Sequence, residues 1–536
     1  MKKIVGILLA CVLMATMLPA ISVQATSDRP EEQVTLSVLT FNTTDYGDRL
    51  AFKELEEKFN IKFDFVYIGS DTKKEKFNIM VQSGDVPDIL IDALQYMTNS
   101  DIYRMGQEGV FMPLNDLVAE YGPTIQNVWA ANPSYEEAAV APDGNIYALP
   151  TYYYGINQEV AQQVFIESNF LKNVGMEMPT TIDEFYAFLK AVKEQDANGN
   201  GDPDDEVPMI SWERDTGCTA LRSAIMGAFC KVSLDDLVVN DGKVTYLAAQ
   251  DGYKDGLAFF AKLYSEGLLY SEVFTLDRNM IWALQESDPD VNTIAVGLGL
   301  HGHSICNWDS TRWKDYEVMP ALQGPVGHGY IPQQPGRGLQ LKTLISANCK
   351  DPERAMMLLD YLASEEGMKL AYWGVEGHDY EVPPAGSVNL IGEPALYRMF
   401  TTAETGEGFL PGFLSHGWPV YQDETMLRNA VDPTQGWLGQ ADKFSHFYFT
   451  ELYKDDLRPA EGYWPASIYY DEGVLAEIAL LKTDLDTAVQ LANAEFVMGI
   501  RDVEKDWDAY INELNGLGLA RYLELSQQQY DLNKKN

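Results

Sequence analysis

The sequence is poor in cysteine and histidine. Cysteines form the disulfide bonds that hold small secreted folds together, and both residues bind transition metals. Its 536 residues include 5 cysteines and 6 histidines, and no cysteine pair has CxxC spacing. So few cysteines do not make a disulfide framework in a chain of this length. Cys218 and Cys230 could pair if the helix expected between them turns back, or they could stay as buried thiols. His301, His303 and Cys306 have no fourth ligand at a recognisable spacing, so no zinc site is predicted there.

Basic residues are scarce as well. Lysine and arginine total 39 against 80 aspartates and glutamates, which gives a formal net charge of −41 at pH 7. Phosphate groups are bound through clustered lysine and arginine, so this balance argues against nucleic acid and anionic membrane surfaces as partners. A strongly negative chain is typical of a protein kept soluble in a salty exterior.

The motifs of common enzymes are missing too. The sequence has neither the GxSxG of a serine nucleophile nor the HExxH of a zinc peptidase. A GxGxxG at residues 297–302 follows an expected strand, but no amphipathic helix follows it, so we interpret it as a glycine-rich crossover. With 80 acidic residues, some pair will lie at the separation that glycoside cleavage needs, so no particular pair is informative. We therefore predict that the protein is not an enzyme.

The first 25 residues have the layout of a secretory signal peptide. Lys2 and Lys3 precede an apolar run over residues 4–21, and residues 23–25 form a small-residue cleavage site. We expect cleavage after Ala25 and a protein that is secreted or held at the cell surface. A lipobox-like LLAC ends at Cys11, which would make this residue a lipid anchor, although the apolar core before it would be short. An uncleaved anchor is the third alternative.

The chain is too long for one hydrophobic core. With 536 residues and 46% apolar residues, it is expected to form two large lobes or three domains. Strand patterns alternate with helical patterns through the first ninety residues, which is typical of a mostly parallel sheet. These strands are expected at residues 34–41, 63–67 and 88–91, and the helices at 48–59 and 72–81. The part after about residue 475 is expected to be helical.

An oxygen-rich loop at residues 196–208 follows an expected helix at 181–193. Its side-chain oxygens are those of Asp196, Asn198, Asn200, Asp202, Asp204, Asp205 and Glu206. Short side-chain oxygens can converge on one hard cation such as Ca²⁺, and Gly201 permits the turn. The loop is not a regular EF-hand, because Val207 stands where the closing glutamate should be. The alternative is a solvated acidic turn whose side chains cap their own backbone.

Several short phrases accompany this loop. They are SGDVPDI at 83–89, DGNIYALP at 143–150, FLKNVG at 170–175 and MPTTIDEF at 178–185. Together with the loop they resemble the large extracellular solute-binding proteins of carbohydrate ABC transporters, Gram-positive relatives of the alginate-binding and LipO-type receptors. The resemblance covers nearly the whole mature chain. It implies a receptor that captures an oligosaccharide and presents it to ABC permease subunits, and we expect it to be a monomer.

The resemblance also implies an α/β, two-lobed fold like that of type II periplasmic binding proteins. The first lobe would comprise residues 26–150 plus about 295–410. The second would comprise about 155–290 plus about 411–536, including the calcium loop at 196–206. Hinge strands near residues 149–155 and 293–299 would flex, and a ligand that contacts both lobes would favour the closed form.

In that family the loop holds a structural calcium ion. Carried over by position, the side chains of Asp196, Asn198, Asn200, Asp205 and Glu206 and the backbone carbonyl of Asp202 would bind it, with Asp204 as the alternative to Asp205. The calcium would rigidify one lobe without touching the sugar.

Aromatic side chains supply the candidate ligand contacts. The sequence has 10 tryptophans and 30 tyrosines, and a flat aromatic ring can stack on the apolar face of a sugar. The candidates are Tyr152 and Tyr153 at the first crossover, Trp282 and Trp308 beside the second, and Trp212 and Trp373. For each of them, packing in a core or at a sheet edge is the alternative. Arg214 and Arg337 are candidates if the ligand is charged.

Two other functions are compatible with the same residues. One is a secreted carbohydrate-active enzyme, a hydrolase or a lyase, which would consume the glycan instead of only binding it. The other is a peptide receptor, since a fold does not fix its ligand.

Overall fold

The computed structural model describes most of the chain, in segments. The described residues are 32–40, 47, 49–69, 72–154, 160, 163–211, 221, 223–233, 236–299, 304–307, 310–334, 336–389, 392–400, 417–430, 452–453, 456, 462–465, 468–470 and 472–533. The expected leader, with Cys11 and the cleavage site after Ala25, lies outside them. Within these segments, no helix has both the length and the apolar content needed to cross a bilayer.

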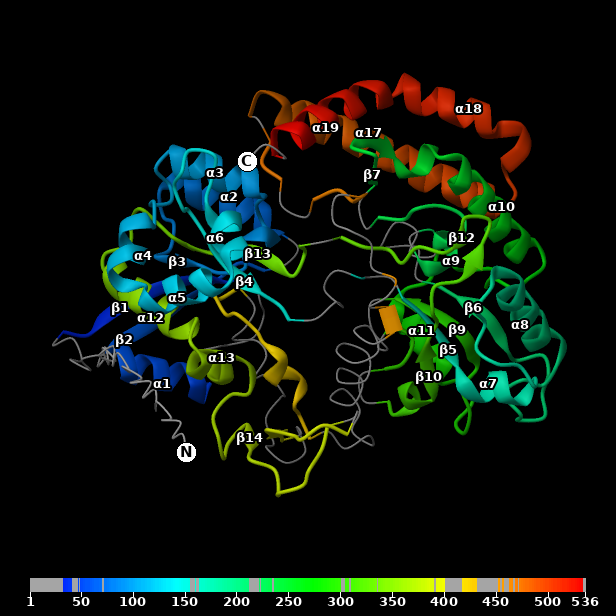
Figure 1. Ribbon diagram of the computed structural model, residues 1–536, viewed down its shortest axis with the longest axis horizontal. Coiled ribbons are helices and arrows are strands. Elements are labelled where there is room, and N and C mark those ends of the chain that lie inside the picture. Colours follow the sequence, from blue (N-terminus) through cyan, green and yellow to red (C-terminus); the bar gives the residue numbers. More distant parts are fainter. Residues whose placement is uncertain are drawn as a thin grey trace, which may run out of the picture.

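The first sheet has five strands in the order β2-β1-β3-β13-β4. β1 runs parallel to β2 and β3, whereas β13 is antiparallel to β3 and β4. The strands are β1 (Val34–Thr40), β2 (Ile61–Tyr67), β3 (Ile89–Leu90), β4 (Leu149–Tyr152) and β13 (Leu339–Ile345). Because β13 comes from a distant part of the sequence, the chain returns to this sheet after forming the strands of a second one (Figure 1).

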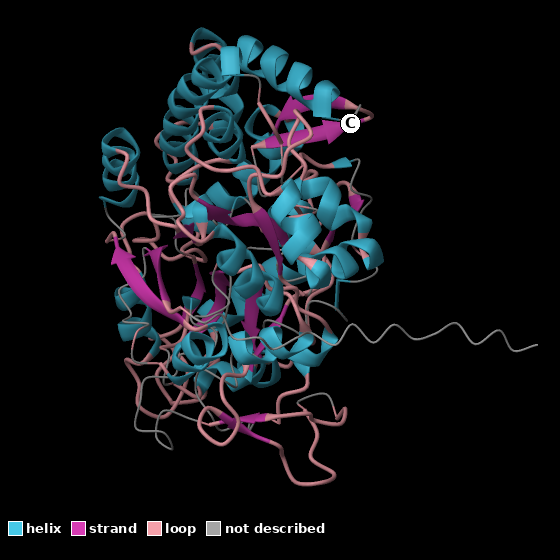
Figure 2. Cartoon of the chain, turned by 90° about the vertical axis from the view of Figure 1, so that its left-hand side faces the viewer, coloured by secondary structure: helices cyan, strands magenta, loops and turns pink. Residues whose placement is uncertain are grey.

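Helices cover this sheet and share a buried hydrophobic core with it. They are α1 (Leu50–Phe59), α2 (Lys73–Ser83), α3 (Asn99–Gln107), α4 (Asn115–Tyr121), α5 (Pro123–Ala131), α6 (Pro133–Ala139), α12 (Pro352–Leu362) and α13 (Glu365–Tyr372), with a 3-10 turn at Ala93–Gln95. Figure 2 looks onto this half of the molecule and shows helices packed around the strands. We call this sheet and its helices the first lobe.

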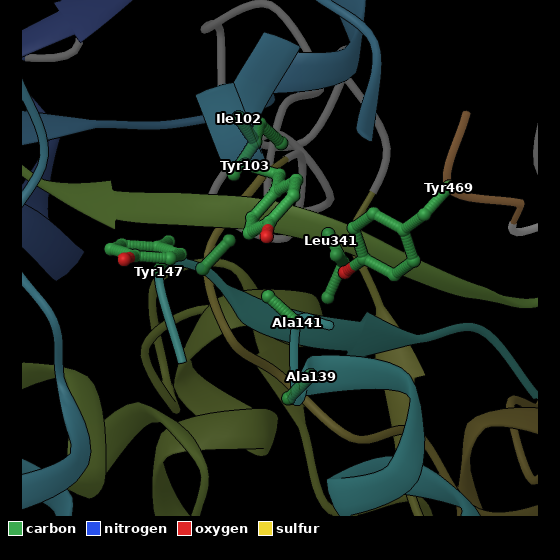
Figure 3. Close-up of a pocket in the computed structure, with 8 residues that line it drawn as sticks. Ile102, Tyr103, Ala139, Ala141, Tyr147, Leu341 and Tyr469 are labelled. Atoms are coloured by element: carbon green, nitrogen blue, oxygen red, sulfur yellow. The ribbon is translucent and has the colours of Figure 1, made fainter. Parts of the chain in front are cut away.

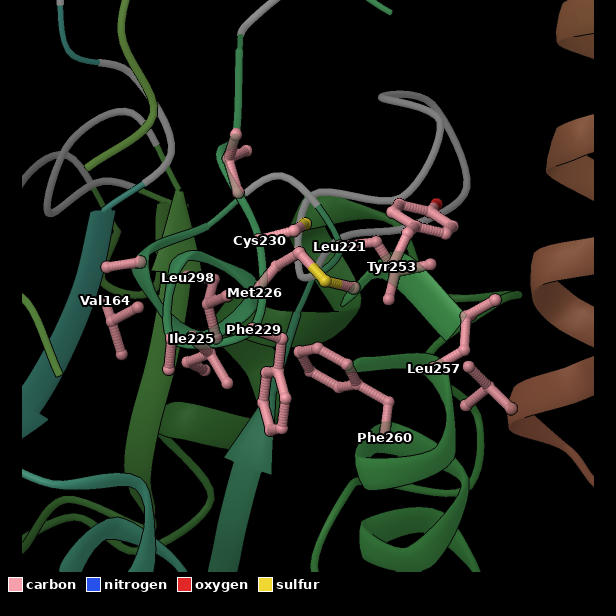
Figure 4. Close-up of a cluster of buried hydrophobic side chains, with 14 of the residues drawn as sticks. Val164, Leu221, Ile225, Met226, Phe229, Cys230, Tyr253, Leu257, Phe260 and Leu298 are labelled. Carbon is pink, nitrogen blue, oxygen red and sulfur yellow. The ribbon is translucent and has the colours of Figure 1, made fainter. Parts of the chain in front are cut away.

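The second sheet has four strands in the order β10-β5-β9-β6, of which only the pair β6 and β9 is parallel. The strands are β5 (Gln163–Glu167), β6 (Val207–Ile210), β9 (Ile294–Gly299) and β10 (Tyr316–Val318). Around it lie α7 (Ser168–Asn173), α8 (Ile182–Glu194), α9 (Ala224–Gly227), α10 (Asp251–Ser265), α11 (Arg278–Gln285), 3-10 turns at Leu247–Ala249 and Arg312–Asp315, and the hairpin of β7 (Leu237–Asn240) and β8 (Lys243–Tyr246). This sheet has its own buried core, part of which Figure 4 shows.

Three C-terminal helices complete this second lobe. They are α17 (Glu472–Val497), α18 (Val503–Gly516) and α19 (Leu519–Asn533), drawn in orange and red in Figure 1. Tyr253 on α10 donates its hydroxyl to Asn493 on α17 at 3.1 Å, and Gln527 on α19 accepts the N–H of Val244 on β8 at 2.7 Å. The helical C-terminal part expected from the sequence is therefore docked on the second core. Small two-stranded pairs lie elsewhere: β11 (Gln323–Gly324) with β12 (Gly327–His328), and β14 (Tyr380–Glu381) with β15 (Arg398–Met399).

The helix expected between Cys218 and Cys230 is much shorter than predicted. In the described residues it is α9, Ala224–Gly227. The Gly227 carbonyl, which would accept a bond from the next turn of a longer helix, accepts the N–H of Tyr330 at 3.0 Å instead. Cys230 is a buried free thiol, and burial raises its pKa to about 12. Cys218 lies outside the described residues, and the free Cys230 thiol agrees with the alternative of buried thiols rather than a pair.

Residues 468–470 lie between the two lobes. The Tyr469 side chain packs on the first core, with its ring edge-to-face against Tyr103 of α3 at 6.1 Å (Figure 3). The residue before it belongs to the second core, and the N–H of the residue after it donates to Ser100 Oγ at 3.0 Å. Asn533 of α19 bonds both the N–H and the carbonyl of Tyr469, each at 3.0 Å. This short segment therefore joins the C-terminal helices to α3 of the first lobe.

A further segment, residues 417–422, lies beside β4. The N–H of Tyr152 donates to the Val420 carbonyl, and the Tyr152 carbonyl accepts the N–H of Gln422, both at 3.0 Å. Trp418 in this segment has no exposed surface, and its ring centre lies 6.1 Å from that of Phe52. The segment thus fixes the end of β4 and contributes its tryptophan to the first core.

Replacing Trp418 by alanine should destabilise the first lobe strongly. The ring is completely buried, so its loss should lower the free energy of unfolding by about 3–5 kcal/mol. Denaturant unfolding followed by circular dichroism measures the change. As a control, Leu480→Ala removes a side chain that is 65% exposed and should change stability by less than about 0.5 kcal/mol. Equal effects of the two substitutions would contradict the assignment of Trp418 to the core.

Candidate functional site

The oxygen-rich loop follows α8 directly. This helix begins with a capping box, in which Thr181 Oγ1 accepts the Glu184 N–H at 3.1 Å and Glu184 accepts the Thr181 N–H at 3.2 Å. Two residues after the helix, Asp196 accepts the N–H groups of Gly199 at 2.8 Å and Gly201 at 3.0 Å, one on each carboxylate oxygen. Both glycines have positive φ, 80° and 96°, which side chains other than glycine rarely adopt. The loop is therefore wound around the Asp196 carboxylate.

Asp205 is the point at which the side chains of the loop converge. Its Oδ1 accepts from Asn198 Nδ2 at 2.8 Å and its Oδ2 accepts from Asn200 Nδ2 at 2.7 Å. Asp204 and Asp202 point elsewhere, since both are exposed, and Asp202 accepts the Asp204 N–H at 3.2 Å. Of the two adjacent aspartates, Asp205 is the one that contacts the asparagines.

Glu206 closes the loop from the other side. Its Oε1 accepts the N–H groups of Ala197 at 2.7 Å and Asn198 at 3.3 Å. Its Oε2 is shielded from solvent and has no hydrogen-bond partner among the described residues. Burial raises the pKa of Glu206, because the carboxylate loses hydration that no positive group replaces. A buried carboxylate oxygen without a hydrogen-bond partner is compatible with a cation site.

The donor set of this loop fits a hard divalent cation. Carboxylates, asparagine carbonyls and a backbone carbonyl are the oxygen ligands that Ca²⁺ takes. No group of three acidic, histidine or cysteine side chains in the described segments is close enough to hold a metal alone, and two amide NH₂ groups lie against Asp205. Each amide oxygen already accepts a backbone N–H, Asn198 Oδ1 that of Asn200 at 2.9 Å and Asn200 Oδ1 that of Asp202 at 2.8 Å, so cation binding would require both side chains to shift.

The loop leads into the second sheet beside β9, the strand expected to return to the first lobe. The chain after β9 instead remains in the second lobe, where β10 pairs with β5, and it rejoins the first sheet at β13. The residue after Glu206 begins β6, and its N–H donates to the Thr293 carbonyl at 2.8 Å. Val207 pairs with Ile294, the first residue of β9. Asn173 of α7 holds the other end of the loop by donating to the Ala197 carbonyl at 2.9 Å. The conformation of the loop and the start of β9 are therefore directly connected.

A buried ion pair lies at the end of β4, the strand from which the chain passes to the second lobe. Lys342 on β13 contacts Asp92, just after β3, with 2.7 Å between Nζ and Oδ1, and the two side chains are 7% and 2% exposed. Lys342 Nζ also donates to the hydroxyl of Tyr153 at 3.1 Å. Burial raises the pKa of Tyr153, so this hydroxyl stays protonated. Local sequence pattern does not predict this pair, because its members are 250 residues apart.

The predicted aromatic contacts are placed in different surroundings. Tyr152 is half-buried, with its ring centre 5.1 Å from that of Tyr135. Trp282 on α11 is half-buried, with the Arg278 guanidinium 5.9 Å from its ring centre. Trp373 is only 4% exposed.

The environment of Trp373 does not suit a sugar contact. Its ring stacks on Tyr397 at 4.2 Å and meets the edge of Tyr380 at 5.6 Å, in a small core that also contains Met399. Both faces of a ring packed in this way are shielded, so we drop Trp373 from the ligand candidates. Trp212, Trp308 and Arg214 lie outside the described residues, and Arg337 is half-buried.

Removing Lys342 should cost far more stability than removing an exposed lysine. Lys342→Ala leaves the Asp92 carboxylate buried without its partner, which should lower the free energy of unfolding by about 3–5 kcal/mol. The matched control is Lys369→Ala, because Lys369 pairs with Glu365 at the surface and such pairs contribute about 0–1 kcal/mol. Denaturant unfolding measures both, and equal losses would show that the Asp92 charge is solvated.

Three comparisons with known proteins bear on this geometry. A family model described as bacterial extracellular solute-binding protein matches residues 51–385. The chain is 26% identical over 531 residues to the fructooligosaccharide ABC transporter substrate-binding protein FusA of Streptococcus pneumoniae, covering 94% of this chain and 92% of that protein. The structure of FusA in complex with kestose has a TM-score of 0.73 and 25% identity, covering 94% of this chain and 100% of that one.

Other solved structures share the fold. A solute-binding protein from Bifidobacterium longum infantis, described as HMO-binding and ABC-transporter associated, has a TM-score of 0.75 at 21% identity and covers 94% of this chain and 99% of that one. The alginate-binding protein AlgQ2, solved without calcium ion, has a TM-score of 0.65 at 22% identity with the same coverage. FusA has also been solved as an EF-hand mutant. These likenesses confirm the predicted two-lobed α/β fold.

Proposed function

The chain belongs to the bacterial extracellular solute-binding proteins, and we propose that it is the receptor of a carbohydrate importer, which binds an oligosaccharide between its lobes and passes it to ABC permease subunits. The observation that carries this proposal is the likeness to FusA over nearly the full length of both chains, in sequence and in fold. No covalent step is needed for this function. The protein acts outside the cytoplasmic membrane, secreted or anchored at the surface.

The two cores of the structure support binding by lobe closure. Each lobe buries its own set of hydrophobic residues, so each can move as a rigid body about the connecting strands. A ligand that contacts both lobes stabilises the closed arrangement by its differential affinity for it. β4 leads from the first lobe to the second, and we propose that Tyr152 and Tyr153 near it, together with Trp282, Trp212 and Trp308, supply ligand contacts.

The charge of the chain indicates which oligosaccharides it takes. At a formal net charge of −41, the protein repels polyanionic glycans at long range. FusA, with its kestose complex, is described as a fructooligosaccharide receptor, which is a class of uncharged sugars. We therefore infer that the ligand is a neutral oligosaccharide.

We also propose that the 196–206 loop binds calcium as a structural ion. The residues that would hold it are Asp196, Asn198, Asn200, Asp205 and Glu206 through side chains and Asp202 through its carbonyl. When bound, the ion would supply positive charge to a loop that concentrates carboxylates, including the partnerless Glu206 oxygen. Because the loop connects α8 to β6 and β6 pairs with β9, the ion would stiffen the second lobe without touching the sugar.

Calcium should raise the thermal unfolding midpoint of the mature protein, residues 26–536. A ligand that binds only the folded state stabilises it by mass action, by about 2.7 kcal/mol at a hundred times the dissociation constant. Asp196→Ala should abolish the calcium-dependent increase, since the loop is wound around this carboxylate. Asp204→Ala, one exposed acid in the same loop, is the control and should keep it. Loss of the increase in Asp204→Ala alone would move the ligand assignment to that residue.

A panel of glycans should identify the ligand class. We expect one group of neutral oligosaccharides to raise the unfolding midpoint and to reduce the radius of gyration measured by small-angle X-ray scattering, because the lobes close. Mass spectrometry of the incubated sugar should show no product. Turnover of the glycan would establish a hydrolase or lyase instead. A response to peptides but to no sugar would establish a peptide receptor.

A further inference from the structure

Asp288 contacts the oxygen-rich loop although it belongs to a different part of the chain. It lies in residues 286–293, the segment that joins α11 to β9. Its Oδ2 accepts a hydrogen bond from Asn200 Nδ2 at 3.1 Å, across 88 positions of sequence. The same NH₂ group donates to Asp205 Oδ2 at 2.7 Å. Carboxylates from two distant segments therefore share one amide group.

This arrangement concerns the cation, and the inference rests on the calcium role proposed above. Asn200 Oδ1 accepts the Asp202 N–H at 2.8 Å, so the NH₂ group is the part of this amide that lies between the carboxylates of Asp205 and Asp288. Two carboxylate oxygens that converge on one position repel each other unless a positive or hydrogen-donating group lies between them. A hard divalent ion in the place of that NH₂ group would satisfy both carboxylates, since such ions take carboxylate ligands.

Asp288 is held ready for this contact by its own segment. Its Oδ1 is occupied by the N–H groups of Asp290 at 2.7 Å and Val291 at 3.1 Å, which leaves Oδ2 directed at the loop. The Arg312 guanidinium holds the segment in place, because it donates hydrogen bonds to the backbone carbonyls of Gln285, Asp288 and Val291. The carboxylate is thus fixed by the fold before any ion binds.

We propose that Asp288 is part of the cation site, a carboxylate from outside the 196–206 loop that ties the bound ion to the start of β9. The segment before this strand already meets the loop once, through the Val207 N–H and the Thr293 carbonyl. Asp288 adds a second connection from the same segment. Cation binding then fixes the start of β9, an inner strand of the second sheet.

Asp288→Asn is the substitution that tests this role. Asparagine keeps an Oδ1 acceptor for the Asp290 and Val291 N–H groups, so the turn persists and only the charge is lost. We expect calcium affinity, measured by titration calorimetry, to fall about 10- to 100-fold, as for residues that support metal ligands. The matched control is Asp290→Asn, which removes the same charge from an exposed residue of the same segment and should change affinity less than about threefold.

A second readout separates this role from simple loop stability. In the wild type, calcium should slow the amide hydrogen exchange of residues 293–296; the effect should be reduced in Asp288→Asn and kept in Asp290→Asn. Without calcium, the two variants should unfold at the same temperature. If Asp288→Asn binds calcium as Asp290→Asn does while Asp196→Ala has lost it, the role of Asp288 is overturned and the calcium proposal stands. If the wild type binds no calcium, the calcium proposal and the role of Asp288 are both overturned.

Discussion

The separation of the hydrophobic core into two closed clusters is the constraint on which the rest of this structure depends. Burial of apolar surface is the main force that holds each lobe together, and the two clusters share no buried residue. Closure can therefore change the distance between the lobes without opening either core. The motion then depends on the places at which the lobes are joined. Among the described residues these include the segments that connect the two sheets and residues 468–470, where Tyr469 packs on the first lobe.

The segment at 468–470 limits how the lobes can move. It is bonded to α19 through Asn533 and to α3 through Ser100, so it holds the C-terminal helices beside the first lobe. A closing motion that separated these two elements would break those bonds and uncover Tyr469. A motion about an axis close to this segment would keep them. Closure about such an axis is the less costly of the two.

Local pattern explains which parts of the architecture the sequence could predict. The strands and helices of the first ninety residues lie within two residues of their expected bounds, because alternation and helical periodicity are written in adjacent positions. The placement of β13 between β3 and β4, and that of residues 417–422 beside β4, could not be read in this way, since each depends on contacts between residues far apart in the sequence. The helix expected at 218–230 was wrong for the same reason: the Tyr330 N–H, about a hundred residues away, takes the Gly227 carbonyl.

The oxygen-rich loop could be predicted from the sequence, whereas the aromatic ligand contacts could not. The loop could be located because its ligands are close together in sequence, and the structure brings Asn198, Asn200 and Asp205 into contact. The aromatic contacts could not, because most large aromatics serve the cores: Trp313, Trp418 and Trp464 are at most 4% exposed. The sequence around an aromatic residue does not show whether the side chain packs in a core or contacts a ligand. Asp288 and Lys342 were missed because nothing near them in sequence indicates their partners.

The positions of the two charged clusters suggest a common purpose. In the first lobe, Lys342 and Asp92 are buried at the end of β4, and the hydroxyl oxygen of Tyr153, the first residue after the strand, accepts a hydrogen bond from Lys342 Nζ. In the second lobe, the carboxylates of the loop and Asp288 lie at the entry to β9. The three cysteines that the structure describes are buried free thiols, so none of them forms a disulfide at these strand ends. A buried charge at a strand end resists displacement because moving it exposes an unpaired partner, whereas apolar contacts slide at lower cost. An ion pair at the end of β4 and a cation at the start of β9 would therefore keep a strand end rigid in each lobe and confine bending to the residues between the lobes, which is where closure requires it.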